Sequence, residues 1–136
     1  SSMLGKANLI KEGNDITIVA YSNMVNVVKE AIAAEELQDC SIELIDLQTV
    51  SPIDYDTIKN SLKKTKRLLV CQEAPSNSSV GTTVISKIVE SELFHELEVA
   101  PKLVSGLHSP MPSAKHLELN VIPQAEDITN AVKSML

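Results

Sequence analysis

Short apolar runs alternate along this chain with segments that repeat hydrophobic residues at helical spacing. Residues 16–21, 41–47 and 67–72 are rich in Val, Ile and Leu, which is typical of strands that are buried on both faces of a sheet. Strands that alternate with helices predict a mostly parallel sheet with helices on both faces, which is an α/β three-layer sandwich.

The remaining elements follow from the same signals. We expect a short strand at residues 101–105 and helices that start after residue 23 and cover residues 55–62, 80–92 and 125–136. Ser22, Asn23 and Asp54 are candidate helix caps. Residues 106–123 hold three of the six prolines and show no steady period, so we expect an irregular, folded-back segment there.

Length and composition exclude several classes of protein. A chain of 136 residues fits one domain that needs no disulfide or metal. Aromatic residues make up 2% of the chain and the net charge is −6, so nucleic-acid binding is not expected. No apolar run approaches the roughly 20 residues of a membrane span. We expect residues 1–3 to be an expression remnant and residues 4–136 to form a single domain.

The two cysteines, Cys40 and Cys71, do not have the spacing of a metal site. Each stands at the edge of an apolar run, so we expect small buried side chains in a reducing compartment.

Groups that could carry chemistry are few, and each has a simpler explanation. The loop before Gly81 could bind a phosphate at a helix start, but a tight turn and a helix cap explain it as well. Glu73 follows a strand directly and could be a buried acid or an interface hydrogen-bonding group. His108 could be a general base, although no nucleophile stands beside it in sequence. His95 and His116 are expected at the surface.

Three carboxylates, Asp46, Asp54 and Asp56, are close together in sequence. A metal ion would need them to converge in space, which spacing alone does not supply. Helix capping and interface ion pairs are the alternatives. The sequence therefore predicts a well-formed α/β domain in which we assign no catalytic, cofactor-binding or metal-ligating residue.

An ordered set of short motifs nevertheless resembles a known family. The motifs are Gly5-Lys6-Ala7, residues 15–21, Met24-Val25, residues 46–54, Glu73-Ala74-Pro75, Val80-Gly81, Ala100-Pro101, residues 105–112, Ile122-Pro123, Ile128 and Ala131-Val132. Together they resemble the carboxyl-terminal domain of the transketolase superfamily. The narrower likeness is to the β subunit of the thiamine-dependent component of 2-oxoacid dehydrogenase complexes, which act on pyruvate or 2-oxoisovalerate.

The resemblance implies a largely parallel five-stranded sheet and a division of labour. Thiamine diphosphate and Mg²⁺ would be held by other domains of the parent enzyme, while this domain would bind no cofactor and would build subunit contacts. The implied partners are sibling domains and subunits and a dihydrolipoyl acyltransferase, with weak homodimerisation of the isolated domain. The implied location is the bacterial cytoplasm, the mitochondrial matrix or a plastid.

The resemblance is incomplete at several positions. The family often has Gly at Ser22, Arg at Gln48, a Gly-x-Gly-x-Glu motif at residues 79–83 and Asp at His108. The interface ion pairs that those residues make in the family are therefore not carried over.

Two other readings stay open. The domain could belong to transketolase or deoxyxylulose-phosphate synthase, or it could be a stand-alone interaction module. For docking of an acyltransferase with a basic segment, the candidates are Glu96 and Glu98 in the acidic stretch at residues 90–98, and the terminal Leu136.

Overall fold

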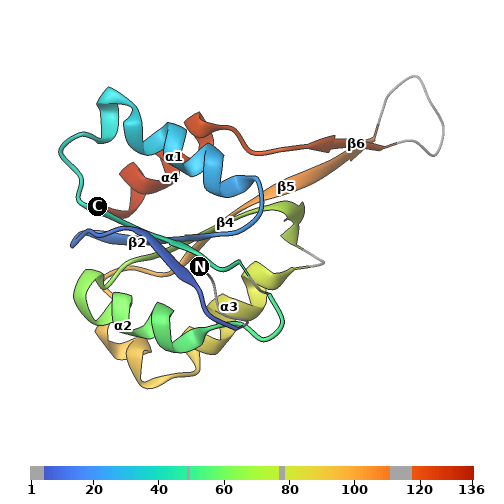
Figure 1. Cartoon of the computed structure of the whole chain (residues 1–136). Helices are drawn as coiled ribbons and strands as arrows, with labels where there is room; N and C mark the ends of the chain where they lie inside the picture. Colours follow the sequence, from blue (N-terminus) through green and yellow to red (C-terminus); the bar gives the residue numbers. More distant parts are fainter. Residues whose placement is uncertain (1–4, 49, 77–78, 111–117) are drawn as a thin grey trace.

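The computed structural model describes residues 5–48, 50–76, 79–110 and 118–136, and it shows a sheet between two layers of helices (Figure 1). Six strands lie in the order β1-β3-β2-β4-β5-β6. The four inner strands are parallel to one another: β2 (Ile16–Ala20), β3 (Ile42–Asp46), β4 (Leu68–Pro75) and β5 (Lys102–Pro110). The predicted α/β sandwich is therefore confirmed.

Two antiparallel strands complete the sheet. β1 (Asn8–Lys11) pairs with the outer side of β3, which makes five strands in the body of the domain, as the family resemblance implied. β6 (Glu118–Val121) pairs with residues 107–110 of β5. The expectation of an irregular segment at residues 106–123 was thus wrong for these two stretches. Pro110 does not prevent this pairing, because it is the last residue of β5, where a missing backbone N–H is tolerated.

Helices cover both faces of the sheet. On one face α1 (Met24–Ala33) packs against α4 (Ala125–Met135), and on the other lie α2 (Tyr55–Thr65) and α3 (Val80–Val89) (Figure 1). Two short 3₁₀ helices, η1 (Glu35–Leu37) and η3 (Glu92–Glu96), follow α1 and α3. None of the described helices has both the length and the apolar character needed to cross a membrane.

Adjacent strand residues feed two separate cores. Ile18 packs in the cluster under α1 and α4, while its neighbour Val19 packs in the cluster under α2 and α3. This division follows from the alternation of side chains along a strand. It explains why the inner strands are mostly apolar and do not strictly alternate with polar residues.

The helix starts confirm one predicted cap and contradict another. Asp54 caps α2, since its carboxylate accepts a hydrogen bond from the backbone N–H of Thr57 at 3.2 Å. Asn23 precedes α1 but makes no side-chain capping bond, and Ser22 has a left-handed backbone with φ of 58°. The start of α1 is fixed by the turn itself, through a bond from the Val25 N–H to the Ser22 carbonyl at 3.2 Å.

The β5–β6 pair forms an arm that extends beyond the body of the domain (Figure 1). Gly106 lies where the arm leaves β4, opposite Pro75. A Cβ atom at position 106 would overlap the carbonyl oxygen of Glu73, so only glycine allows β5 to pass this close.

Candidate functional site

The carboxyl edge of the sheet contains a point where chain connections diverge. The chain leaves β2 through α1 toward β3, whereas it leaves the adjacent strand β4 through α3 toward β5. In open α/β sheets, the crevice beyond the carboxyl ends of two such strands is the usual place for a ligand.

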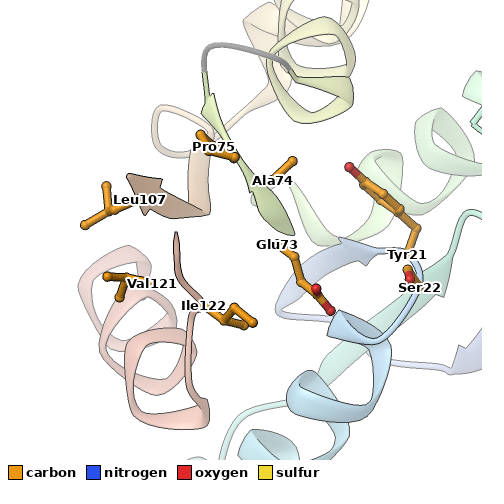
Figure 2. A pocket seen from close by; sticks show the side chains of 8 residues that line it. All are labelled: Tyr21, Ser22, Glu73, Ala74, Pro75, Leu107, Val121 and Ile122. Carbon is orange, nitrogen blue, oxygen red and sulfur yellow. The ribbon is translucent and has the colours of Figure 1, made fainter. Parts of the chain in front are cut away.

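A pocket of about 420 Å³ occupies this crevice (Figure 2). It lies between the residues that follow β2, the last residues of β4 and the base of the arm. Its lining comprises Tyr21, Ser22, Glu73, Ala74, Pro75, Leu107, Val121 and Ile122. This volume falls within the range of small-ligand pockets.

Gln72 positions the β4 end of the pocket. Its side chain is fully buried and accepts a hydrogen bond from the Gly81 N–H at 2.7 Å. The same amide donates to the carbonyls of Ala74 at 2.9 Å and Pro75 at 3.3 Å. One buried side chain therefore ties the strand end to the first turn of α3 and fixes the backbone that carries Glu73.

Glu73 and Tyr21 supply the polar end of the pocket. Glu73 is half-buried, and Figure 2 shows its side chain extending into the space between Ser22 and Ile122. Burial, together with the nearby Glu73 charge, raises the pKa of Tyr21, so its hydroxyl stays neutral and can donate or accept a hydrogen bond. Of the two sequence-based interpretations of Glu73, the buried acid does not hold, because the residue is half-buried and lines the pocket.

The apolar side of the pocket comes from the arm. Leu107, Val121 and Ile122 are exposed by 61%, 40% and 44%. Sequence reasoning missed this pocket, because its walls come from three distant stretches of chain and the arm was expected to be irregular. The divergence of the connections after β2 and β4 was the signal that could have located it.

Residues 79–82 form a capped helix start, with Ser79 as the cap of α3. Two amide groups there are already used: the Thr82 N–H donates to Ser79 Oγ at 2.7 Å, and the Gly81 N–H donates to Gln72. The simpler of the two sequence-based interpretations is therefore confirmed.

The carboxylates at residues 46–56 have separate roles. Asp46 accepts the backbone N–H of Gln48 at 2.9 Å, and Asp54 accepts those of Ala7 and Thr57. Burial alone would raise the pKa of Asp54, but these hydrogen bonds and the Thr57 hydroxyl hold it below its usual value. Among the described residues, no group of three or more His, Cys, Asp or Glu converges as a metal site would require.

Neither cysteine lines the pocket, and neither does His95. Cys71 is fully buried, which raises its pKa to about 12, and Cys40 is half-buried. His95 is exposed on η3, with its ring 5.4 Å from that of Phe94. His108 pairs in register with Asn120 in the arm. His116 and the side chain of His108 lie outside the described part of the structure.

The predicted docking residues lie near the opposite, amino edge of the sheet. Glu96 ends η3 and is exposed, as is Glu98. The Glu98 N–H donates to the Lys66 carbonyl at 2.9 Å, and Arg67 Nε donates to the Met135 carbonyl at 2.8 Å. The structure thus brings Glu98 and the 57% exposed Leu136 to either side of residues 66–67.

Comparison with known proteins identifies the family. Residues 5–128 match the model of the transketolase C-terminal domain, and the chain belongs to that family. It is similar to pyruvate dehydrogenase E1 component subunit beta from several organisms. The identity is 40% over 131 residues for Rickettsia bellii, 37% over 130 residues for the mitochondrial protein of Pisum sativum, and 42% over 120 residues for Mycoplasma pneumoniae.

These matches cover 87–96% of this chain but only 36–40% of each relative. Among solved structures, a split-gene transketolase, an inactive tetramer of beta chains, superposes with a TM-score of 0.72 at 24% identity. That superposition covers 99% of this chain and 42% of the other. A 2-oxoglutarate:ferredoxin oxidoreductase from Magnetococcus marinus superposes with a TM-score of 0.61 at 13% identity. That superposition covers 96% of this chain and 19% of the other. Both likenesses support the fold alone.

Proposed function

We propose that this chain is the C-terminal domain of a pyruvate dehydrogenase E1 β subunit. The observation that carries the proposal is identity of 36–42% with such subunits over nearly the whole chain. The parent would decarboxylate pyruvate and pass the acyl group to a lipoyl arm. The relatives include bacterial and mitochondrial proteins, so the proposed location is the bacterial cytoplasm or the mitochondrial matrix.

The proposed role of the domain is subunit assembly rather than chemistry. Its chain would be about two-fifths of the parent subunit, by comparison with the relatives. Thiamine diphosphate and Mg²⁺ would bind to the other domains. The protruding arm, with exposed Leu107 and Val121, supports a role in contacts with neighbouring domains or subunits.

A second part of the proposal is acyltransferase docking at the amino edge. Glu96 and Glu98 are exposed acids, and Leu136 adds an exposed apolar group at the same amino edge, next to the Met135 carbonyl that Arg67 contacts. A basic segment of the acyltransferase would be steered to this edge by charge and held by the apolar contact.

Two alternatives remain from the sequence. A transketolase or deoxyxylulose-phosphate synthase would carry the same domain, and the split-gene transketolase structure shares this fold. Relatives at 40% and 42% identity favour the dehydrogenase. A stand-alone interaction module would function without any upstream domain, and the sequence of the parent gene distinguishes it.

Calorimetry with thiamine diphosphate and Mg²⁺ tests the assignment of roles. We expect the 136-residue chain to show no binding heat and no decarboxylation of pyruvate. Tight binding or turnover by the chain alone would contradict it.

A further inference from the structure

The pocket beyond β2 and β4 combines one acid with an apolar wall. Glu73 provides the charge, and the hydroxyls of Tyr21 and Ser22 can accept hydrogen bonds beside it. The opposite wall consists of Leu107, Val121 and Ile122 from the arm, which remain substantially exposed. A carboxylate at one end and aliphatic side chains along the wall fit a group that has a cationic head on an aliphatic stem.

The charge in the pocket argues against the ligand that such crevices often bind. Phosphate groups of nucleotides bind beyond parallel strands through free amides at a helix start. Here the α3 amides of Gly81 and Thr82 are already bonded, and Glu73 would repel an anion. A guanidinium or ammonium group meets neither obstacle.

Glu73 also has no cationic partner within the described part of the chain. The ion pairs recorded there join Lys59 with Glu92, Lys64 with Glu43, and Lys133 with Glu36. A half-buried carboxylate in an apolar-walled pocket is stabilised when a cation pairs with it. The Glu73 carboxylate is therefore available to a cation from outside the described residues.

We propose that this pocket receives an arginine or lysine side chain from a part of the parent enzyme outside this chain, with the cation on Glu73 and the stem along Leu107, Val121 and Ile122. The assignment of the occupant to the parent enzyme rests on the proposed function. It is supported by charge complementarity and by the roughly three-fifths of the relatives' length that lies outside the matched region. The arm would then be held between the domain body and its neighbour.

Nuclear magnetic resonance on the isolated chain tests the chemistry of the pocket without reference to the parent. The probe is N-acetyl-L-arginine methylamide, and N-acetyl-L-citrulline methylamide is the neutral probe of the same shape. We expect the arginine probe to shift the amide signals of Ser22, Glu73, Ala74 and Ile122 saturably, and the citrulline probe to bind more weakly. Equal shifts with both probes would overturn the proposal.

Substitutions make the same test residue by residue. Glu73→Gln should weaken binding of the arginine probe about fivefold, the upper range for one exposed ion pair. Ile122→Ala should also weaken it and changes an exposed position, so the fold is expected to tolerate it. Glu30→Gln changes an exposed acid on α1 that is not part of the pocket lining, and it should leave binding unchanged. Wild-type binding by both pocket variants would overturn the proposal.

The parent enzyme then identifies the occupant. There, Glu73→Gln should raise the concentration at which subunits or domains separate by about fivefold, whereas Glu30→Gln should not. If the probe binds the isolated chain but the Glu73→Gln parent associates like wild type, the pocket is a small-molecule site and the proposed side-chain occupant is wrong. Failure of the proposed function would appear differently, as a wild-type domain that does not assemble into a dehydrogenase at all.

Discussion

The carboxylate of Asp54 accepts a hydrogen bond from the backbone N–H of Ala7 at 2.9 Å, across 47 residues of sequence. The same carboxylate accepts the Thr57 N–H at 3.2 Å and the Thr57 hydroxyl at 2.6 Å. One side chain therefore starts α2 and also holds the segment that leads into β1. The Asp54 carboxylate therefore has a structural role, and the groups that it contacts, on Ala7 and Thr57, are not catalytic partners.

Asp54→Ala should destabilise the domain by about 1–2 kcal/mol, because both the cap and the long-range anchor are lost. Urea unfolding followed by circular dichroism measures the free energy of unfolding. Asp39→Ala removes an exposed acid with no recorded partner and should change stability by less than about 0.5 kcal/mol. Equal effects of the two substitutions would show that Asp54 is not an anchor.

Much of this fold could be predicted from the sequence, because local pattern and tertiary packing agree. The run at residues 16–21 contains β2 at Ile16–Ala20, and the helix expected at residues 55–62 is α2. The arm was missed because its strands lack the apolar periodicity of buried elements. Exposed Leu107 and Val121 carry no such periodicity, and pairing between distant residues is not visible in local sequence.

Acid should weaken the domain through Glu43. This residue is buried, and Lys64 Nζ donates to its Oε1 at 2.5 Å while the Gly13 N–H donates at 3.0 Å. Burial alone would raise the pKa of Glu43, but the bonds from Lys64, Ser61 and Gly13 outweigh it and lower the pKa. A lowered pKa gives stability that is complete above the unfolded-state value of about 4.3 and is lost as the pH falls through the folded-state value.

Glu43→Gln should therefore flatten the loss of stability between neutral and acid pH. At pH 7 it should cost about 1–3 kcal/mol, since a charged hydrogen-bonding partner is removed. Unfolding midpoints across this pH range measure both effects, with the exposed Glu35→Gln as the matched control. An acid profile identical to wild type would refute a stabilising role for the Glu43 carboxylate.

Gly106→Ala should disturb the junction between the arm and the domain body. The added methyl group would meet the backbone carbonyl of Glu73, which cannot move without separating β5 from β4. We expect a loss of about 1–3 kcal/mol in thermal or urea unfolding, as for other overpacked sites. At Gly81 the same methyl group meets the ends of the Gln72 and Leu103 side chains, so Gly81→Ala should cost less. The reverse order would argue against the close approach at Gly106.

Reversing the charges of Glu96 and Glu98 tests docking at the amino edge. In the full-length enzyme, replacing both by Lys should weaken binding to the acyltransferase at least about fivefold, and the effect should shrink at high salt. Glu30→Lys on α1 is the control with a single reversed charge elsewhere on the surface. Surface plasmon resonance at two ionic strengths measures the loss of binding and its salt dependence for the double variant and for the control. Unchanged binding by the double variant would remove these two residues from the docking surface.

The candidate sites could be predicted less completely than the fold. The sequence supplied Glu73 as an acid at a strand end, but it did not show that Tyr21 and Ile122 face the same pocket. Those positions are set by sheet order, which depends on packing between distant segments. Glu96 and Glu98 were selected by charge and Leu136 as the terminal residue, and the structure adds that Glu98 and Leu136 flank residues 66–67. Gln48 has a left-handed backbone with φ of 57°, and nothing in the structure explains the choice of glutamine there.

A domain graft tests the central claim most directly. Residues 5–136 would replace the matching C-terminal segment of the pyruvate dehydrogenase E1 β subunit of Rickettsia bellii, with which the chain shares 40% identity. The measurement is pyruvate decarboxylation by the purified chimera with its partner subunit and thiamine diphosphate. We predict an assembled enzyme that retains most of the unmodified activity. A folded chimera that neither assembles nor turns over pyruvate would contradict the assignment.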